Sequence, residues 1–185
     1  MAWGDESGSN AKLDPGTYIL GAVILERRHV DEVRQATSEL IRKGQHKRHW
    51  RDESAGSNKA IIETITKLPI ENYVVVRANC VDDKIERRRR KCLEVFAPNL
   101  AAMGCENLTL ESRGRAADKK DMDLLDAMRA RHQMDSSFRL DHAAGPADPI
   151  LWLADAVCGA VVADRSGDSQ FLTALESRLT LEELG

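Results

Sequence analysis

The chain has 185 residues, the length of one ordinary domain, and we expect residues 1–185 to fold as a single unit that needs no disulfide or metal staple. Its 30 acidic and 27 basic residues leave a net charge of −3, which excludes a generally basic nucleic-acid coat protein and a disordered acidic tail. An anionic partner must therefore be met by local basic segments, and an aromatic content of 4% disfavours an extended base-stacking platform.

Apolar segments and helical spacing alternate along the first third of the chain. A very short strand over 2–4 leads into turn-forming residues, so Asp5 is expected at the end of that strand. Residues 18–25 are apolar on both faces, which predicts a buried strand that pairs with the first as a hairpin. Apolar residues three and four positions apart predict a helix over 30–41 and a second over 61–68, before Pro69.

The later elements continue this alternation. In chain order they are a strand over 73–79, a helix over 85–103, a strand over 108–111, a helix over 118–131, an edge strand over 137–140, a helix over 150–162 and a helix over 171–179. A hairpin followed by alternating helices and strands indicates an α/β protein with a mixed sheet of about five strands, covered by helices on both faces.

Cysteine usage and the apolar segments bear on the compartment. The four cysteines form no CxxC pair and have no zinc-finger spacing to a histidine, so we expect reduced thiols. The apolar runs at 18–25 and 150–163 are too short to span a bilayer, and the first residues lack the apolar stretch of a signal peptide. We therefore expect a soluble cytoplasmic protein without membrane contact. The sequence is also compatible with a homodimer.

The most informative single residue is Asp155, in the middle of the most apolar predicted helix. A lone carboxylate there costs several kcal/mol unless it is paired or bound to a metal. It either lies on a solvent-facing side of the helix or points into a polar cleft. Asp148, seven residues earlier, falls near the same helix face, although helix capping is its simpler role.

Two further acids follow predicted strands. Asp5 and Glu111 stand where loops leave a rigid sheet, a common place for catalytic groups. The alternative is that acids at such positions only form turns. A cluster of Asp5, Glu111 and Asp155 is therefore a hypothesis that spacing alone does not establish.

Basic residues gather in two places. Residues 43–51 combine positive charge with an aromatic ring, and within them Lys47, His49 and Trp50 are candidates for binding nucleic acid. The run over 87–91 is denser, but consecutive helical residues point around a full turn, so a solvated face is the favoured interpretation.

Several motifs resemble one family. Asp5-Glu6-Ser7-Gly8 resembles the "DESG" signature that opens the bacterial and phage family called domain of unknown function 3800. Leu151-Trp152-Leu153-Ala154-Asp155 resembles its late "L-x-L/I-A-D" helix. Leu110-Glu111-Ser112-Arg113 looks like its middle acidic strand, and Lys47-Arg48-His49-Trp50 like its basic segment. Only four residues precede Asp5, where the family usually has a longer strand, so we expect the first strand to be stunted.

The resemblance implies a ribonuclease H-like fold and a catalytic set of Asp5, Glu111 and Asp155. It implies a nuclease that hydrolyses phosphodiester bonds in RNA or DNA with Mg²⁺ or Mn²⁺, because converging carboxylates repel one another unless cations lie between them. Two ions roughly 4 Å apart would hold the attacking water and the leaving oxygen. Glu6, Asp148 or Asp118 would supply a further metal ligand.

Other assignments stay open at this stage. Arg113 or His49 could contact the scissile phosphate, and either could equally be a surface residue. The whole chain could instead be a non-catalytic scaffold of the same fold that binds nucleic acid or a protein partner. A third alternative is a hydrolase of nucleotides or other small phosphates.

Overall fold

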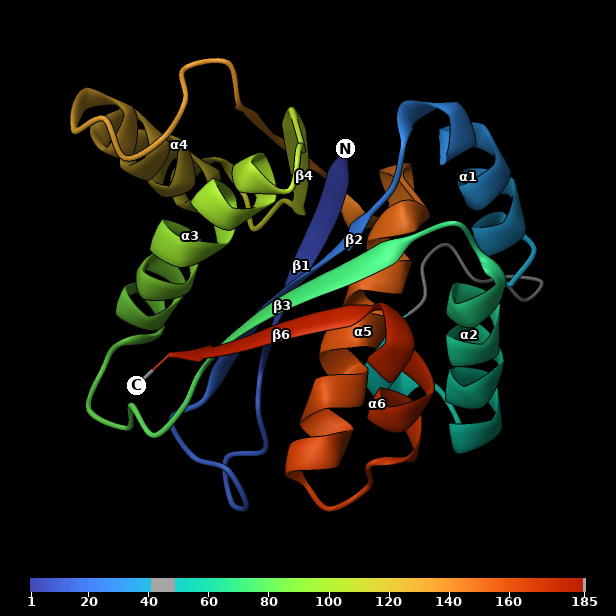
Figure 1. The fold of residues 1–185 in the computed structure, drawn as a ribbon. Helices are drawn as coiled ribbons and strands as arrows, with labels where there is room; N and C mark the ends of the chain where they lie inside the picture. Colours follow the sequence, from blue (N-terminus) through green and yellow to red (C-terminus); the bar gives the residue numbers. More distant parts are fainter. Residues whose placement is uncertain (41–48, 185) are drawn as a thin grey trace.

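A computed structural model describes residues 1–40 and 49–184, and its centre is one mixed β-sheet (Figure 1). The strands are β1 (Ala2–Gly8), β2 (Tyr18–Ile24), β3 (Glu71–Arg77), β4 (Asn107–Glu111), β5 (Arg139–Ala143) and β6 (Leu179–Leu184). They lie in the order β5-β4-β1-β2-β3-β6. β1, β2 and β3 form an antiparallel meander, whereas β4, β5 and β6 join by parallel pairing.

Helices cover both faces of this sheet (Figure 1). They are α1 (Val30–Ser38), α2 (Ala55–Lys67), α3 (Ile85–Ala102), α4 (Arg115–Ala130), α5 (Ile150–Arg165) and α6 (Gln170–Leu175). Side chains alternate along each strand, so neighbouring residues enter different cores. Trp3 packs with α1, α2, α5 and α6, and Ala2 packs with α3 and α4 on the other face.

α5 is the central helix of its layer and is buried over most of its length. It packs close to the sheet because β2 has a glycine beneath it: a Cβ at Gly21 would lie 2.7 Å from Cys158 Sγ. Cys158 in turn donates a hydrogen bond to the carbonyl oxygen of Asp5, at 3.3 Å. Neither α5 nor any other helix of the described residues is long and apolar enough to cross a membrane.

Most of the predicted elements are confirmed, but two expectations about strands were wrong. The sheet has six strands rather than about five, because the segment after α6 pairs with β3 as an edge strand, where we expected a helix as far as residue 179. The first strand is not stunted either. β1 continues to Gly8 and pairs with β2 at every residue, so the ladder overrides the turn propensity of residues 5–8.

Candidate functional site

A cavity of about 770 Å³ opens where β1 and β4 approach the middle of α5. Six acidic residues line it, and three of them are the predicted catalytic set: Asp5 from β1, Glu111 from β4 and Asp155 from α5. We call these three the cavity carboxylates. Residues 49–53, Ile85 and Arg113 form other parts of the wall. The structure therefore brings together the three residues that the sequence predicted as catalytic.

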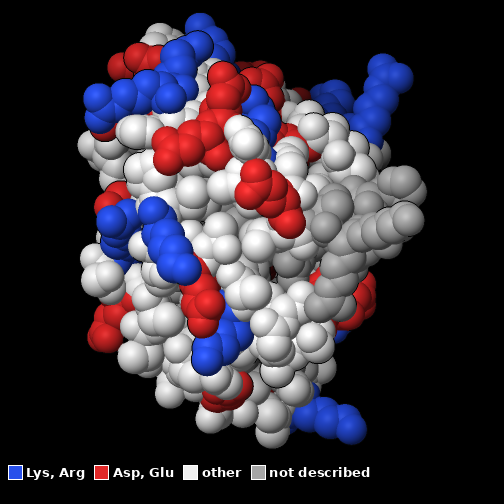
Figure 2. Space-filling view, turned by 90° about the vertical axis from the view of Figure 1, so that its right-hand side faces the viewer, with Lys and Arg blue, Asp and Glu red and all other residues white. Residues whose placement is uncertain are grey.

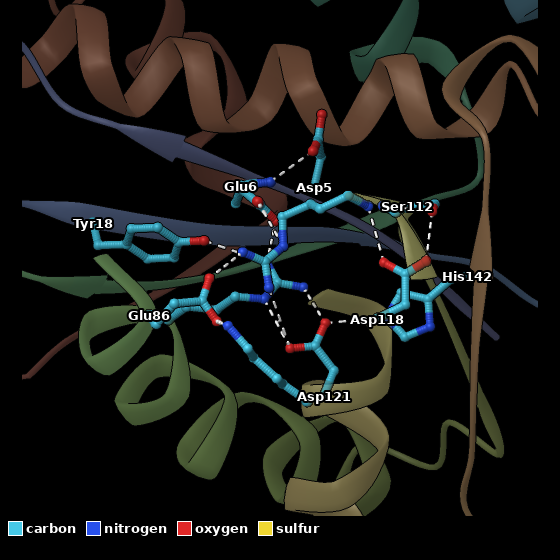
Figure 3. Close-up of polar contacts among 12 residues, drawn as sticks. Asp5, Glu6, Tyr18, Glu86, Ser112, Asp118, Asp121 and His142 are labelled. Carbon is cyan, nitrogen blue, oxygen red and sulfur yellow. Dashed lines mark hydrogen bonds and ion pairs between the residues drawn. The ribbon is translucent and has the colours of Figure 1, made fainter. Parts of the chain in front are cut away.

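Strand register places Asp5 beside Glu111. β1 and β4 run parallel, and their last paired residues are Gly4 and Leu110, so the two acids occupy the next position on each strand. Since side chains alternate along a strand, Asp5 shares the face of Trp3, which is the α5 face. Figure 3 shows Asp5 directed toward α5. Asp5 thus lies within β1, with a ladder partner on β2, and not at the strand end expected from the sequence.

Asp155 reaches the cavity from α5, and a short segment fixes its carboxylate. The backbone N–H of Trp50 donates to Asp155 Oδ2 at 2.7 Å, and His49 Nδ1 lies 4.0 Å from the same oxygen. The Asp155 side chain is 18% exposed, so the solvent-facing alternative is wrong. The apolar sequence of α5 is interrupted by a carboxylate at a residue that lines the cavity.

Trp50 anchors this segment on α5. Its ring packs where Gly159 has no side chain, since a Cβ there would lie 2.2 Å from Trp50 Cγ. It also meets the ring of Phe171 edge-on, with centroids 4.9 Å apart. Asn58 donates to the Trp50 carbonyl at 3.2 Å. The indole therefore packs on α5, and the backbone N–H of Trp50 holds Asp155.

Electrostatic repulsion marks the cavity carboxylates. Burial raises the pKa of Asp5 to about 8, with further contributions first from Asp155 and then from Glu111. A buried carboxylate with acidic neighbours binds a proton in place of the cation that would otherwise neutralise it. Oxygen donors of this kind suit Mg²⁺ or Mn²⁺.

The carboxylates are not prearranged around an ion. Across 1–40 and 49–184, no three histidine, cysteine or acidic side chains converge as closely as a bound metal requires. The chemistry of the donor set fits a divalent cation, and the side chains would have to close around it.

Glu6 lies on the other side of β1. Its Oε2 accepts from Arg89 Nη1, and its Oε1 lies 3.3 Å from Arg113 Nε. Figure 3 shows Glu6 directed away from α5 into a group of charged side chains. Both of its oxygens are therefore held by guanidinium groups, and the structure does not bring Glu6 to the cavity carboxylates as a ligand.

Arg89 is the centre of this group, which we call the Arg89 network. It consists of Glu6, Arg89, Arg113, Asp121 and His142. Arg89 is 1% exposed and binds Asp121 through two hydrogen bonds of 2.9 and 2.6 Å. His142 lies 3.1 Å from Asp121 Oδ2. Although burial opposes it, bonds from His142 and Arg89 lower the pKa of Asp121 to about 2, so the Asp121 carboxylate is ionised at neutral pH.

The other proposed ligands are held elsewhere. Asp148 accepts from Trp3 Nε1 at 2.8 Å and from two nitrogens of Arg34 at 3.1 and 2.8 Å. It also accepts from the backbone N–H of Ile150, the first residue of α5, although the N-cap position itself is Pro149 and not Asp148. Asp118 accepts from Ser112 Oγ at 2.5 Å and is absent from the cavity wall. Neither lies with the cavity carboxylates.

The predicted substrate contacts have different positions. Lys47 lies outside the described residues. His49 is half exposed at the cavity, whereas Arg113 is 21% exposed and also pairs with Glu86 at 2.7 Å. Figure 2 shows positive and negative side chains interspersed over one face of the molecule, with uncharged surface between them.

Sequence reasoning missed the Arg89 network. The run over 87–91 was expected to be a solvated face, and for Arg87 and Arg90 that holds, since both pair with acids at the surface. Arg89 is the exception. It stands three and four positions before Cys92 and Leu93, which are fully buried, and this spacing was the available signal.

Comparisons with known proteins agree on the fold. No family model and no curated protein matches the chain. Among solved structures, the ribonuclease HII of Archaeoglobus fulgidus, in its complex with PCNA, superposes with a TM-score of 0.56 and 13% identity over 93% of this chain and 75% of that chain. Bst-RNase HIII in complex with Mn²⁺ superposes with a TM-score of 0.52 and 10% identity over 89% of this chain and 53% of that chain. The chain has a ribonuclease H-like fold, as the sequence predicted, with six strands.

Proposed function

We propose that this protein is a divalent-metal-dependent nuclease that hydrolyses phosphodiester bonds of RNA or DNA. The observation that carries the proposal is the cavity itself, which Asp5, Glu111 and Asp155 line. Burial first, and then the charges of Asp155 and Glu111, raise the pKa of Asp5 to about 8. Acids with no function are rarely buried beside like charges, because each pays for its own desolvation. The neighbouring structures, a ribonuclease HII and a ribonuclease HIII, support the same class of reaction.

Asp5, Glu111 and Asp155 are the residues that would hold Mg²⁺ or Mn²⁺. When bound, such an ion lowers the pKa of a coordinated water and neutralises charge on the leaving oxygen. Asp5 is electrostatically coupled to the other two, since both of them raise its pKa. Glu6 and Asp148 are left out of this ligand set because arginines already hold their carboxylates.

The protein's own residues would orient the substrate. The backbone N–H of Trp50 keeps Oδ2 of Asp155 in place at the cavity. His49, beside Asp155 and half exposed, is the group best placed to meet a phosphate or to donate a proton to a departing oxygen. Arg113 adds positive charge to the cavity wall.

The family membership is a further part of the proposal. We infer that the chain belongs to the family called domain of unknown function 3800. The motifs that carry this resemblance come from residues 5–8, 110–113 and 151–155, which are far apart in the sequence. In the structure, each of them supplies one cavity carboxylate.

Cleavage of labelled single- and double-stranded oligonucleotides of RNA and DNA tests the proposal. We expect cleavage with Mn²⁺ or Mg²⁺, none with a chelator, and loss in Asp5→Asn, Glu111→Gln and Asp155→Asn. Asp164→Asn, on the same helix but outside the cavity wall, is the matched control and should remain active. A protein that binds the ion and the oligonucleotide but cleaves neither RNA nor DNA would instead be a binding scaffold.

A further inference from the structure

The backbone pairing between β1 and β4 stops one residue before the cavity carboxylates. Gly4 and Leu110 are the last partners of this parallel pair. In the described residues, the remainder of β1 pairs with β2 alone, while β4 keeps its partner β5 as far as Glu111 and Ala143. The ladder thus brings Asp5 and Glu111 side by side, but in the described residues no β1–β4 backbone pair lies beyond Gly4 and Leu110 to hold them there.

The Arg89 network spans the gap that the ladder leaves. Glu6, next to Asp5 on β1, lies 3.3 Å from Arg113, which follows Glu111 by two residues. This ion pair joins the two strand ends, and both of its residues line the cavity. Arg113 also pairs with Glu86 of α3, so the end of β4 is tied to that helix.

Arg89 sets the position of this bridge. Its guanidinium is buried and binds Glu6 from β1, Asp121 from α4 and the hydroxyl of Tyr18 at the start of β2. A guanidinium presents its donors in a rigid fork, so these partners cannot shift independently. Because adjacent strand residues point to opposite faces, any rotation of Glu6 about β1 also turns Asp5.

We propose that Arg89 is a positioning residue: through Glu6 and Arg113 it holds the ends of β1 and β4 at the separation that lets Asp5 and Glu111 share one divalent cation. The inference rests on the proposed function for its purpose, but not for its geometry. It also gives Glu6 a role different from that of a metal ligand, since the Glu6 carboxylate is the group of β1 that binds Arg89.

Arg89→Lys is the discriminating variant, because lysine keeps the positive charge and loses the fork. Arg165→Lys is the matched control. Arg165 also holds one carboxylate with two bonds, to Asp14 at 2.5 and 3.1 Å, and lies outside the network and the cavity wall. Mn²⁺ affinity of the full chain is measured by calorimetric titration at a temperature where both variants are folded. We expect at least tenfold weaker binding in Arg89→Lys and less than a twofold change in Arg165→Lys.

The opposite result identifies a different role for Glu6. If Glu6 were a metal ligand restrained by Arg89, Arg89→Lys would release it, and Mn²⁺ binding would be unchanged or tighter. That outcome overturns the inference. Glu6→Gln should weaken binding as Arg89→Lys does, and the double variant should be no weaker than either single variant, because both changes break the same link.

Hydrogen–deuterium exchange of the metal-free protein separates this inference from the proposed function. We expect faster exchange in residues 5–8 and 111–113 of Arg89→Lys, and no change there in Arg165→Lys. Unchanged exchange in Arg89→Lys would overturn the inference, even if the variant bound Mn²⁺ more weakly than wild type. If exchange were faster in Arg89→Lys but the wild type bound no Mn²⁺, the positioning role of Arg89 would stand. The proposal that the protein is a metal-dependent nuclease would then be wrong. Should Arg89→Lys not fold, Asp121→Asn serves instead, because Asp121 contacts Arg89 and lies outside the cavity wall.

Discussion

Asp155, on α5, raises the pKa of Asp5, on β1, more than any other side chain does. The two residues stand near opposite ends of the chain, and the close approach of α5 to β2 at Gly21 and Cys158 brings them together. This relationship makes the metal-free cavity a place of unfavourable charge, which a proton or a divalent cation can relieve. The predictions on pH and on Mn²⁺ that follow depend on whether a proton or a divalent cation neutralises Asp5.

The stability of the metal-free protein should fall as the pH rises from about 4 to about 8. Asp5 has a pKa of about 8 in the folded protein and an ordinary value of 3.8. The folded state therefore holds the proton more tightly, so this contribution is complete below pH 3.8 and is lost as the pH passes through 8. The loss is at most about 1.4 kcal/mol for each pH unit. Thermal unfolding in a chelator should show Asp5→Asn stabilised at pH 8 relative to wild type and little changed at pH 4. An equal effect at both pH values would contradict the buried, protonated Asp5.

Mn²⁺ should stabilise the wild type, and more so at pH 8 than at pH 6. Protons compete with the ion for Asp5, so affinity should fall by about tenfold for each pH unit below the pKa. An ion at 100 times its dissociation constant adds about 2.7 kcal/mol to the free energy of unfolding. Calorimetric or thermal-shift titrations measure this effect. Asp155→Asn should abolish it, and Asp164→Asn should keep it; retention in Asp155→Asn would place the ion elsewhere.

Asp148→Asn should destabilise the protein without removing the metal. Its carboxylate accepts from Trp3 and binds Arg34 with two bonds, and the change weakens a partly buried pair by about 1–3 kcal/mol. Chemical denaturation measures the loss. Mn²⁺ affinity, taken under conditions where the variant is fully folded, should stay within a factor of two. A large loss of Mn²⁺ affinity would show that Asp148 is a metal ligand after all.

Gly159→Ala should displace Trp50 and, with it, the hydrogen bond to Asp155. The new methyl group would lie 2.2 Å from the indole ring, and overpacking of this kind costs about 1–3 kcal/mol. We expect lower stability together with weaker Mn²⁺ binding. Gly56→Ala is the matched control, because it lies in α2 with no atom within 4 Å of an added Cβ, and alanine is the better helix former. If Gly159→Ala bound Mn²⁺ as wild type does, the Trp50 contact would not matter to the site.

The sequence marked each cavity carboxylate as a candidate by a local pattern, and the family resemblance joined the three into one set. Asp155 stands out as the charge inside an apolar helix, and Glu111 as the acid that closes a short alternating strand. Local patterns of this kind record a tertiary environment, so they can be read without a structure. The helices and most of the strands were predicted for the same reason, since their apolar faces repeat at regular intervals.

Strands and ion pairs that depend on a partner far away in the sequence could not be predicted from local patterns. Residues 5–8 have the composition of a turn, and they form a strand because β2 offers them a partner at every position. β6 is polar at an edge and pairs with β3 from the far end of the chain. The choice between Glu6 and Asp148 as a further ligand depended on Arg89 and Arg34, whose positions no spacing predicts.

Crystals of the full chain soaked with Mn²⁺ at pH 8 test the central claim most directly, through the anomalous scattering of the ion. The account predicts density at coordination distance, about 2.1 Å, from oxygens of Asp5 and Asp155, with Glu111 completing the shared site. Density only at the surface, or none near Asp5 while the ion binds elsewhere, would contradict it.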